Sequence, residues 1–133
     1  MLLKGLWPLF TVLCAACDGE RTSTAAPTPS PVEQLVNRVW TKPAADGLPG
    51  LMRIFLADGV LVQDSCWETH RLSPWSLSSE GVLIWDEDGR SITADIVAVD
   101  ERALILRLHL SDGDEEQRFV PASAPYVCPD LPR

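Results

Sequence analysis

The chain has 133 residues, and its 19 Asp and Glu outnumber 11 Lys and Arg, which gives a formal net charge of −8. Because an acidic protein repels phosphate groups, this balance excludes nucleic acids and anionic lipid surfaces as electrostatic partners. The length suits one small domain with short extensions.

An export signal is predicted at the amino terminus. Lys4 supplies a positive charge, residues 6–16 form an apolar run and small residues precede Cys17. The run is well short of the roughly 20 residues that a membrane-spanning helix needs. The ending LCAAC at residues 13–17 resembles the lipobox of bacterial lipoproteins. This resemblance implies cleavage before Cys17 and attachment of a diacylglyceryl group to that cysteine, and an ordinary cleaved signal peptide is the alternative.

The same resemblance implies a division of the chain and a location. Residues 1–16 would be the lipoprotein signal peptide, residues 17–31 the lipidated cysteine with a Pro/Ser/Thr-rich spacer, and residues 32–133 a single β-rich domain. A spacer of this composition is expected to be extended and semi-rigid. The lipid anchor would hold the protein in the bacterial cell envelope, facing the periplasm. Asp18 resembles the signal that retains such proteins in the inner membrane.

Cys66 and Cys128 are the cysteines that remain in the body of the exported protein. In an oxidising compartment, two remaining cysteines predict a disulfide. The alternative is a reactive or metal-binding pair, because Cys66, Glu68 and His70 would share one face of a regular strand. No further ligand is spaced to complete a metal site, so the sequence predicts neither a metal nor a cofactor.

The body is predicted to consist of short strands separated by turns. A helical turn is expected at residues 32–37, and turn signals recur every 8 to 12 residues or so, with Asp58-Gly59 the strongest. Strands are predicted at 38–41, 51–56, 60–70, 75–77, 82–85, 91–99, 103–110 and 117–120, with a turn at Ser73-Pro74 and an acidic turn around residues 112–116.

The strand pattern predicts an all-β fold. The leucines at 104, 106, 108 and 110 alternate with polar or mixed residues, and the apolar residues at 92, 94, 96 and 98 do the same. Seven or eight short strands must curl to bury a core, so we expect a small antiparallel meander closed into a barrel or half-barrel.

A second resemblance points the same way. Trp40 in the first strand, the pattern Phe-x-x-Asp-Gly at residues 55–59, Ser-Pro-Trp at residues 73–75 and the late Leu-rich strand are similar to small lipocalin-like barrel domains of bacterial lipoproteins. The similarity spans residues 39–120 and implies a barrel fold.

No catalytic residues are predicted. The sequence holds no Gly-x-Ser-x-Gly motif, no Ser/His/Asp spacing, no Cys-x-x-Cys and no calcium loop, so we do not expect an enzyme. Trp40, Trp67, Trp75 and Trp85 are the candidate binding residues, because tryptophans that are not in the core favour ligand cavities and docking patches.

The sequence therefore favours a non-catalytic module that binds an envelope protein. A carrier of a small hydrophobic ligand is the alternative. A hollow barrel would favour the carrier, whereas a filled barrel with an exposed tryptophan would favour the protein partner.

Overall fold

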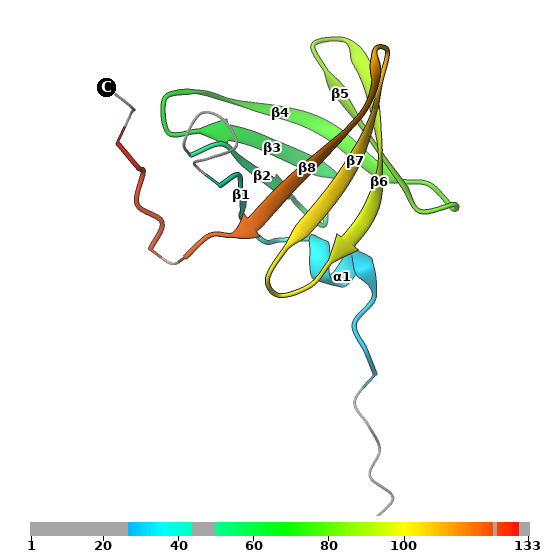
Figure 1. The fold of residues 1–133 in the computed structure, drawn as a ribbon, viewed down its shortest axis with the longest axis horizontal. Coiled ribbons are helices and arrows are strands. Elements are labelled where there is room, and N and C mark those ends of the chain that lie inside the picture. Colours follow the sequence, from blue (N-terminus) through cyan, green and yellow to red (C-terminus); the bar gives the residue numbers. More distant parts are fainter. Residues whose placement is uncertain (1–26, 44–49, 124, 131–133) are drawn as a thin grey trace, which may run out of the picture.

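The chain forms a closed antiparallel barrel in which each strand pairs with the next and the last strand pairs with the first (Figure 1). The computed structural model describes residues 27–43, 50–123 and 125–130. Within these ranges the strands are β1 (Trp40–Thr41), β2 (Met52–Phe55), β3 (Val60–Ser65), β4 (Glu68–Leu77), β5 (Val82–Glu87), β6 (Arg90–Val99), β7 (Leu104–Leu110) and β8 (Gly113–Pro121). The predicted all-β meander is confirmed, and the barrel is closed.

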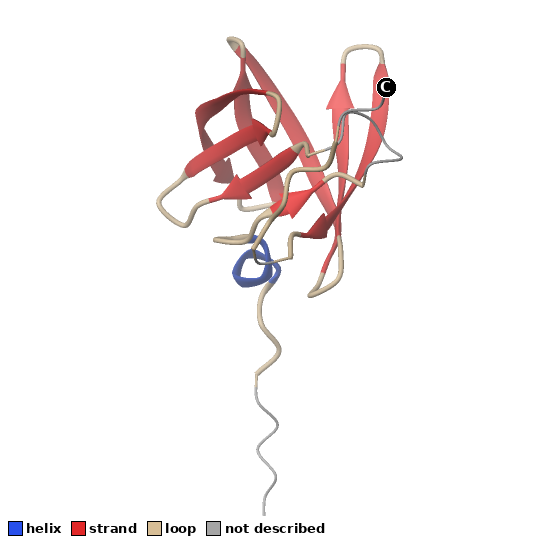
Figure 2. Ribbon diagram, turned by 90° about the vertical axis from the view of Figure 1, so that its left-hand side faces the viewer, coloured by secondary structure: helices blue, strands red, loops and turns tan. Residues whose placement is uncertain are grey.

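One short helix, α1 (Pro31–Leu35), closes one end of the barrel (Figure 2). It begins at a capping box, in which the Ser30 hydroxyl accepts from the Glu33 backbone N–H and the Glu33 carboxylate accepts from the Ser30 N–H. Leu35 is fully buried, and its carbonyl accepts a hydrogen bond from Trp40 Nε1 at 3.0 Å. The helical turn predicted at 32–37 therefore covers the apolar core at this end of the barrel.

The core fills the interior of the barrel. Alternate residues of each strand point inward, and each buried large apolar side chain contributes about 1.5–3 kcal/mol to folding. The leucines at 104, 106 and 108 are buried as the period-2 pattern predicts. The buried apolar cluster consists of Leu35, Trp40, Phe55, Leu61, Leu83, Trp85, Ala94, Leu104, Leu106, Leu108 and Phe119.

The strand boundaries predicted between residues 60 and 77 are wrong. The sequence pattern predicts one strand over 60–70 and a turn at Ser73-Pro74, but the chain turns at residues 66–67 and β4 continues through Pro74. The long β4 strand therefore supplies the residues that were divided between two predicted strands.

Pro74 is tolerated inside β4 because no backbone hydrogen bond to a neighbouring strand requires an N–H donor at that position. Trp75 N–H donates to the Gly59 carbonyl at 2.8 Å, on the β3 side, so the missing N–H of Pro74 would face β5. On that side the ladder begins only at the pair Trp75 and Trp85. Beyond Pro74, toward residue 68, no pairing of β4 with β5 is recorded in the described part of the chain.

Two further predictions differ in detail. A bulge in β6 between Ile96 and Ala98 shifts the alternation, so Ala98 is exposed and Val99 packs against the core in its place. The β7–β8 turn is tight, with Leu110 opposite Gly113, so the acidic residues 114–116 lie in β8 instead of forming a loop.

Candidate functional site

One end of the barrel lies next to α1, and the other end holds a polar cavity. Near α1, Asn37 N–H donates to the Phe55 carbonyl, and Arg38 donates to the carbonyl of Asp100 in the β6–β7 turn. Because the strands are antiparallel, the β3–β4, β5–β6 and β7–β8 turns lie at the opposite end, which we call the mouth. A cavity of about 310 Å³ opens there. Its lining is mostly polar and includes Lys42, Arg53, Gln63, Glu68, Arg71 and Glu87.

Strand register directs Arg53 into the barrel. Residues that face each other across an antiparallel pair share one side of the sheet. Arg53 of β2 pairs with Trp40 on one side and with Gln63 on the other, and Trp40 is completely buried. The Arg53 side chain therefore lies on the interior face, at the boundary between the apolar core and the mouth.

Aromatic rings enclose the Arg53 guanidinium. Its Cζ lies 5.1 Å from the centroid of the Trp85 ring and 5.3 Å from that of Phe119. Such contacts are favourable because ring faces attract a cation, and more so when both are desolvated. Burial lowers the pKa of the Arg53 guanidinium from its ordinary value, and the charges of Glu87 and Glu115 oppose that shift. Arg53 Nη1 is buried and has no acceptor among the described residues.

Sequence reasoning missed Arg53. The signal was available, because Arg53 and Phe55 are two residues apart in a strand predicted at 51–56 and so share one face. A charged residue on the apolar face of a small barrel is uncommon and marks a site to inspect. Only closure of the barrel brought Trp85 and Phe119, from distant strands, into contact with this charge.

An exposed ion pair lies at the mouth, where β4 and β5 are not paired. Arg71 of β4 and Asp88 of the β5–β6 turn form this ion pair at 2.6 Å, with both side chains more than half exposed. An exposed ion pair of this kind contributes little stability. The Ser73 hydroxyl, on the interior face of β4 opposite Leu61, is buried without a partner among the described residues.

The four predicted binding tryptophans have different locations. Trp40 and Trp85 are buried in the core. Trp75 is partly buried, donates from Nε1 to the Leu56 carbonyl at 2.9 Å and meets Phe55 edge to face at 5.3 Å. Trp67 is 44 % exposed. The structure therefore brings three of them into or against the core and leaves Trp67 on the surface.

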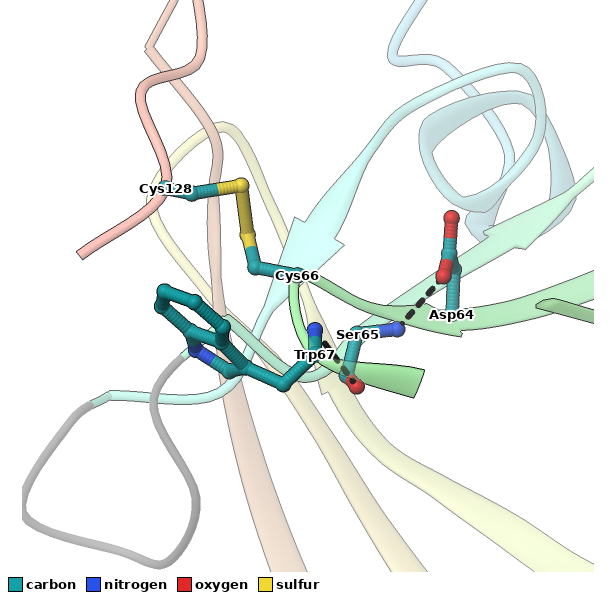
Figure 3. The surroundings of a disulfide bond; sticks show 5 residues. All are labelled: Asp64, Ser65, Cys66, Trp67 and Cys128. Carbon is teal, nitrogen blue, oxygen red and sulfur yellow. Dashed lines mark hydrogen bonds between the residues drawn. A yellow bond between two sulfur atoms is a disulfide. The ribbon is translucent and has the colours of Figure 1, made fainter. Parts of the chain in front are cut away.

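Cys66 and Cys128 form the predicted disulfide, with their Cα atoms 5.7 Å apart. Cys66 lies in the β3–β4 turn, and Cys128 belongs to the tail that follows β8 (Figure 3). Trp67 follows Cys66 in the turn, and its backbone N–H donates to the Ser65 hydroxyl at 3.4 Å (Figure 3). Val127, next to Cys128, is 77 % exposed. We call Trp67 and Val127 the bridge surface.

Gly50 packs against this disulfide, and replacing it should destabilise the protein. Its φ is +86°, and a Cβ placed on it would lie 2.8 Å from Cys66 Sγ. We expect Gly50→Ala to lower the free energy of unfolding by about 2 kcal/mol or more, because the left-handed backbone cost adds to the contact. Urea unfolding at unchanged m-value measures the loss.

Gly81→Ala is the matched control for Gly50→Ala. Gly81 has a φ of +85°, but a Cβ there would meet nothing within 4 Å. The difference between the two variants therefore isolates the contact with Cys66. Equal losses in both variants would show that the disulfide does not restrict Gly50.

The candidate metal face predicted from Cys66, Glu68 and His70 does not form. Cys66 lies in the turn and in the disulfide, whereas Glu68 and His70 are exposed on β4. Among the residues that the structure describes, no group of three or more His, Cys, Asp or Glu is arranged to hold a metal ion.

A histidine on the outer surface bridges two carboxylates. His109 Nδ1 lies 2.9 Å from Asp114 Oδ1, and Nε2 lies 3.2 Å from Asp95 Oδ2. The hydrogen bond with Asp114 is the main cause that raises the pKa of His109 above its ordinary 6.5, and the charges of Asp114 and Asp95 add to it. These residues come from β6, β7 and β8 and were not predicted to meet.

Stability should therefore depend on the protonation of His109. Because the folded pKa is raised, the contribution of the charged pairs is complete below the unfolded pKa of about 6.5 and is lost as the pH rises through the folded pKa. We expect Asp114→Asn to lower the His109 pKa in an NMR titration and to flatten the stability profile above pH 6.5. Asp112→Asn, in the adjacent turn, should leave the His109 pKa unchanged, and an equal fall in both variants would contradict the assignment.

The amino-terminal predictions concern residues that the structure does not describe. Cys17, Asp18, the signal peptide and the spacer up to residue 26 lie outside the described ranges. Within those ranges, no helix has the length and apolar character required to cross a membrane.

Comparisons with known proteins assign no family or function to the chain. No protein-family model matches the chain, and neither the curated proteins nor the solved structures include a significant match.

Proposed function

We propose that this protein is a lipid-anchored lipoprotein of the bacterial cell envelope whose lipocalin-like barrel acts as a non-catalytic protein-binding module. Cys17 carries the lipid, the Pro/Ser/Thr-rich spacer leads from it to the Ser30 cap of α1, and the barrel faces the periplasm. The support for anchoring is the LCAAC pattern at residues 13–17. The Cys66–Cys128 disulfide is compatible with an oxidising compartment.

The observation that carries the binding role is the bridge surface. Trp67 and Val127 are each adjacent to a disulfide-bonded cysteine, so the bridge restrains the backbone beneath both side chains. Exposed tryptophan on a restrained backbone is typical of binding hot spots, because little conformational entropy is lost when a partner covers it.

The filled interior gives less support to the alternative, a carrier of a small hydrophobic ligand. Trp40, Phe55 and Trp85 are buried inside the barrel, together with leucines from β3, β5 and β7. A lipid-like ligand would have to displace this core. The cavity at the mouth has charged residues in its lining, which an apolar ligand would desolvate at a cost.

Site-specific photo-crosslinking tests the binding role. A photoreactive phenylalanine analogue replaces Trp67 in the full-length protein, expressed in its own envelope and irradiated there. The matched control places the same analogue at Val97, which has the same exposed fraction of 44 % but lies in the β6 bulge. We expect a discrete protein adduct from position 67 and none from position 97. No adduct at 67, or the same adducts at both positions, would refute a docking role for the bridge surface.

A further inference from the structure

Buried hydrogen-bond donors without acceptors gather around Arg53. Arg53 Nη1 and Trp85 Nε1 are both buried, and neither contacts an acceptor in the described part of the chain. Buried N–H groups in native proteins almost always have a partner, because losing hydration without replacement is costly. The guanidinium lies over the ring that carries the second donor. Two buried donors at the boundary between core and mouth are therefore left without an acceptor.

The nearby acidic side chains do not supply what is missing. Glu87 and Glu115 act on Arg53 through their charge, but neither accepts a hydrogen bond from the buried Nη1. Gln63, its neighbour in register, does not accept from Nη1 either. Arg53 is thus a partly buried cation with ring contacts, whose Nη1 is buried and whose side chain lines an open cavity.

A carboxylate suits this arrangement. A guanidinium presents its N–H groups in a planar fork that matches the two oxygens of a carboxylate. The guanidinium of Arg53 already contacts the Trp85 and Phe119 rings, so little side-chain freedom is lost on binding.

The rest of the mouth restricts which carboxylate can enter. Three acidic side chains line the cavity and are balanced by three basic ones, so a ligand with a single negative charge and several hydrogen-bond donors matches the lining better than one with several negative charges: the residues are Asp64, Glu68, Glu87, Lys42, Arg53 and Arg71. These carboxylates favour hydrogen-bond donors on the ligand, such as amide or ammonium N–H groups. A volume of about 310 Å³ lies at the lower limit for ligand pockets and holds only one or two amino-acid residues.

We propose that the mouth binds the α-carboxylate of an amino acid or of a peptide chain end, that Arg53 pairs with this carboxylate and that the acidic lining accepts from the ligand's N–H groups. This inference builds on the proposed binding role and specifies its chemistry. The two sources share one recognised group, and the probes described below distinguish them.

Titration of the full-length protein with three probes tests the site. The probes are free alanine, N-acetyl-glycyl-alanine with its free carboxylate, and the same dipeptide as the amide, with binding followed through the Arg53 Nε–H and Trp85 indole NMR signals. We expect shifts at both groups with at least one carboxylate probe and none with the amide. Binding of the acetylated dipeptide alone would assign the site to chain ends, and binding of alanine as well would include free amino acids.

Variants of Arg53 establish its role. We expect Arg53→Gln to weaken carboxylate binding by about tenfold or more, as loss of a charge-assisted hydrogen bond predicts. Arg118→Gln is the control, because Arg118 is an exposed arginine of β8 outside the cavity. Arg53→Lys keeps the charge without the planar fork and gives a second test if Arg53→Gln does not fold, and it should bind more weakly than the wild type.

Two results would overturn the inference. One is the absence of carboxylate-dependent shifts in the wild-type protein at millimolar probe, and the other is undiminished binding by the folded Arg53 variant. Either result leaves the bridge surface to be judged by crosslinking at position 67, so failure of this site and failure of the proposed function are distinguishable. A protein adduct at position 67 that persists when Arg53→Gln is added would show that the bridge surface binds its partner independently of the mouth.

Discussion

Breaking the Cys66–Cys128 disulfide is expected to lower the free energy of unfolding by about 4 kcal/mol, because the bridge closes a loop of 62 residues in the unfolded chain. A domain of this size has only about 5–15 kcal/mol in total. The melting temperature should therefore fall by more than about 10 °C, given several degrees per kcal/mol for a small domain. Thermal unfolding followed by circular dichroism, with and without dithiothreitol, measures the shift.

A double variant separates the bridge from other effects of the reductant. Cys66→Ser with Cys128→Ser should melt at the temperature of the reduced wild type and should not respond to dithiothreitol. The tail after β8 should also become accessible to proteases in this variant, because the disulfide is its covalent tie to the β3–β4 turn. A shift of less than about 3 °C on reduction would show that the unfolded chain is already compact without the bridge.

Cys17→Ala is expected to abolish lipid attachment completely, because the thiolate of that residue is the proposed acceptor of the diacylglyceryl group. A single buried acyl chain binds a membrane only marginally, whereas two or three hold a domain permanently. Loss of the acceptor should therefore move the protein from the membrane fraction to the soluble fraction or leave it as uncleaved precursor. Metabolic labelling with a fatty acid, followed by fractionation, measures both outcomes.

Cys14→Ala is the matched control, since Cys14 lies three residues upstream in the same apolar run. It should still incorporate label and remain with the membrane. Label that persists in Cys17→Ala would assign the lipid to another residue. If neither variant nor the wild type incorporates label, the signal is of the ordinary cleaved kind and the protein is released.

The strand content of the barrel was predictable because alternation of apolar residues is a local signal. Leu104, Leu106 and Leu108 are two residues apart, and every strand geometry places them on one face. The disulfide was predictable for a different reason, since only Cys66 and Cys128 remained once Cys14 was assigned to the cleaved signal peptide and Cys17 to the lipid. Neither inference needs knowledge of which strands are neighbours.

Turn positions were harder to predict, because a turn depends on pairing as well as on its residues. Ser73-Pro74 has the composition of a turn, yet Pro74 lies within β4 because the β4–β5 ladder ends before it. Cys66-Trp67 has no turn composition, but the disulfide and the β3–β4 register place the reversal there. Competition between local preference and long-range pairing decided both.

The sequence by itself determined the fold class, the alternating core and the disulfide partners, all of which follow from periodicity or from a count of thiols. Only the tertiary structure decided which residues contact the charged side chains of Arg53 and His109. Arg53, Trp85 and Phe119 come from β2, β5 and β8, and their contacts exist because closure of the barrel brings these strands around one interior. His109 likewise meets Asp95 and Asp114 through strand register alone. His109 and Asp114 face each other across the β7–β8 turn, whereas the other contacts depend on pairings between residues far apart in the chain, which no local pattern encodes.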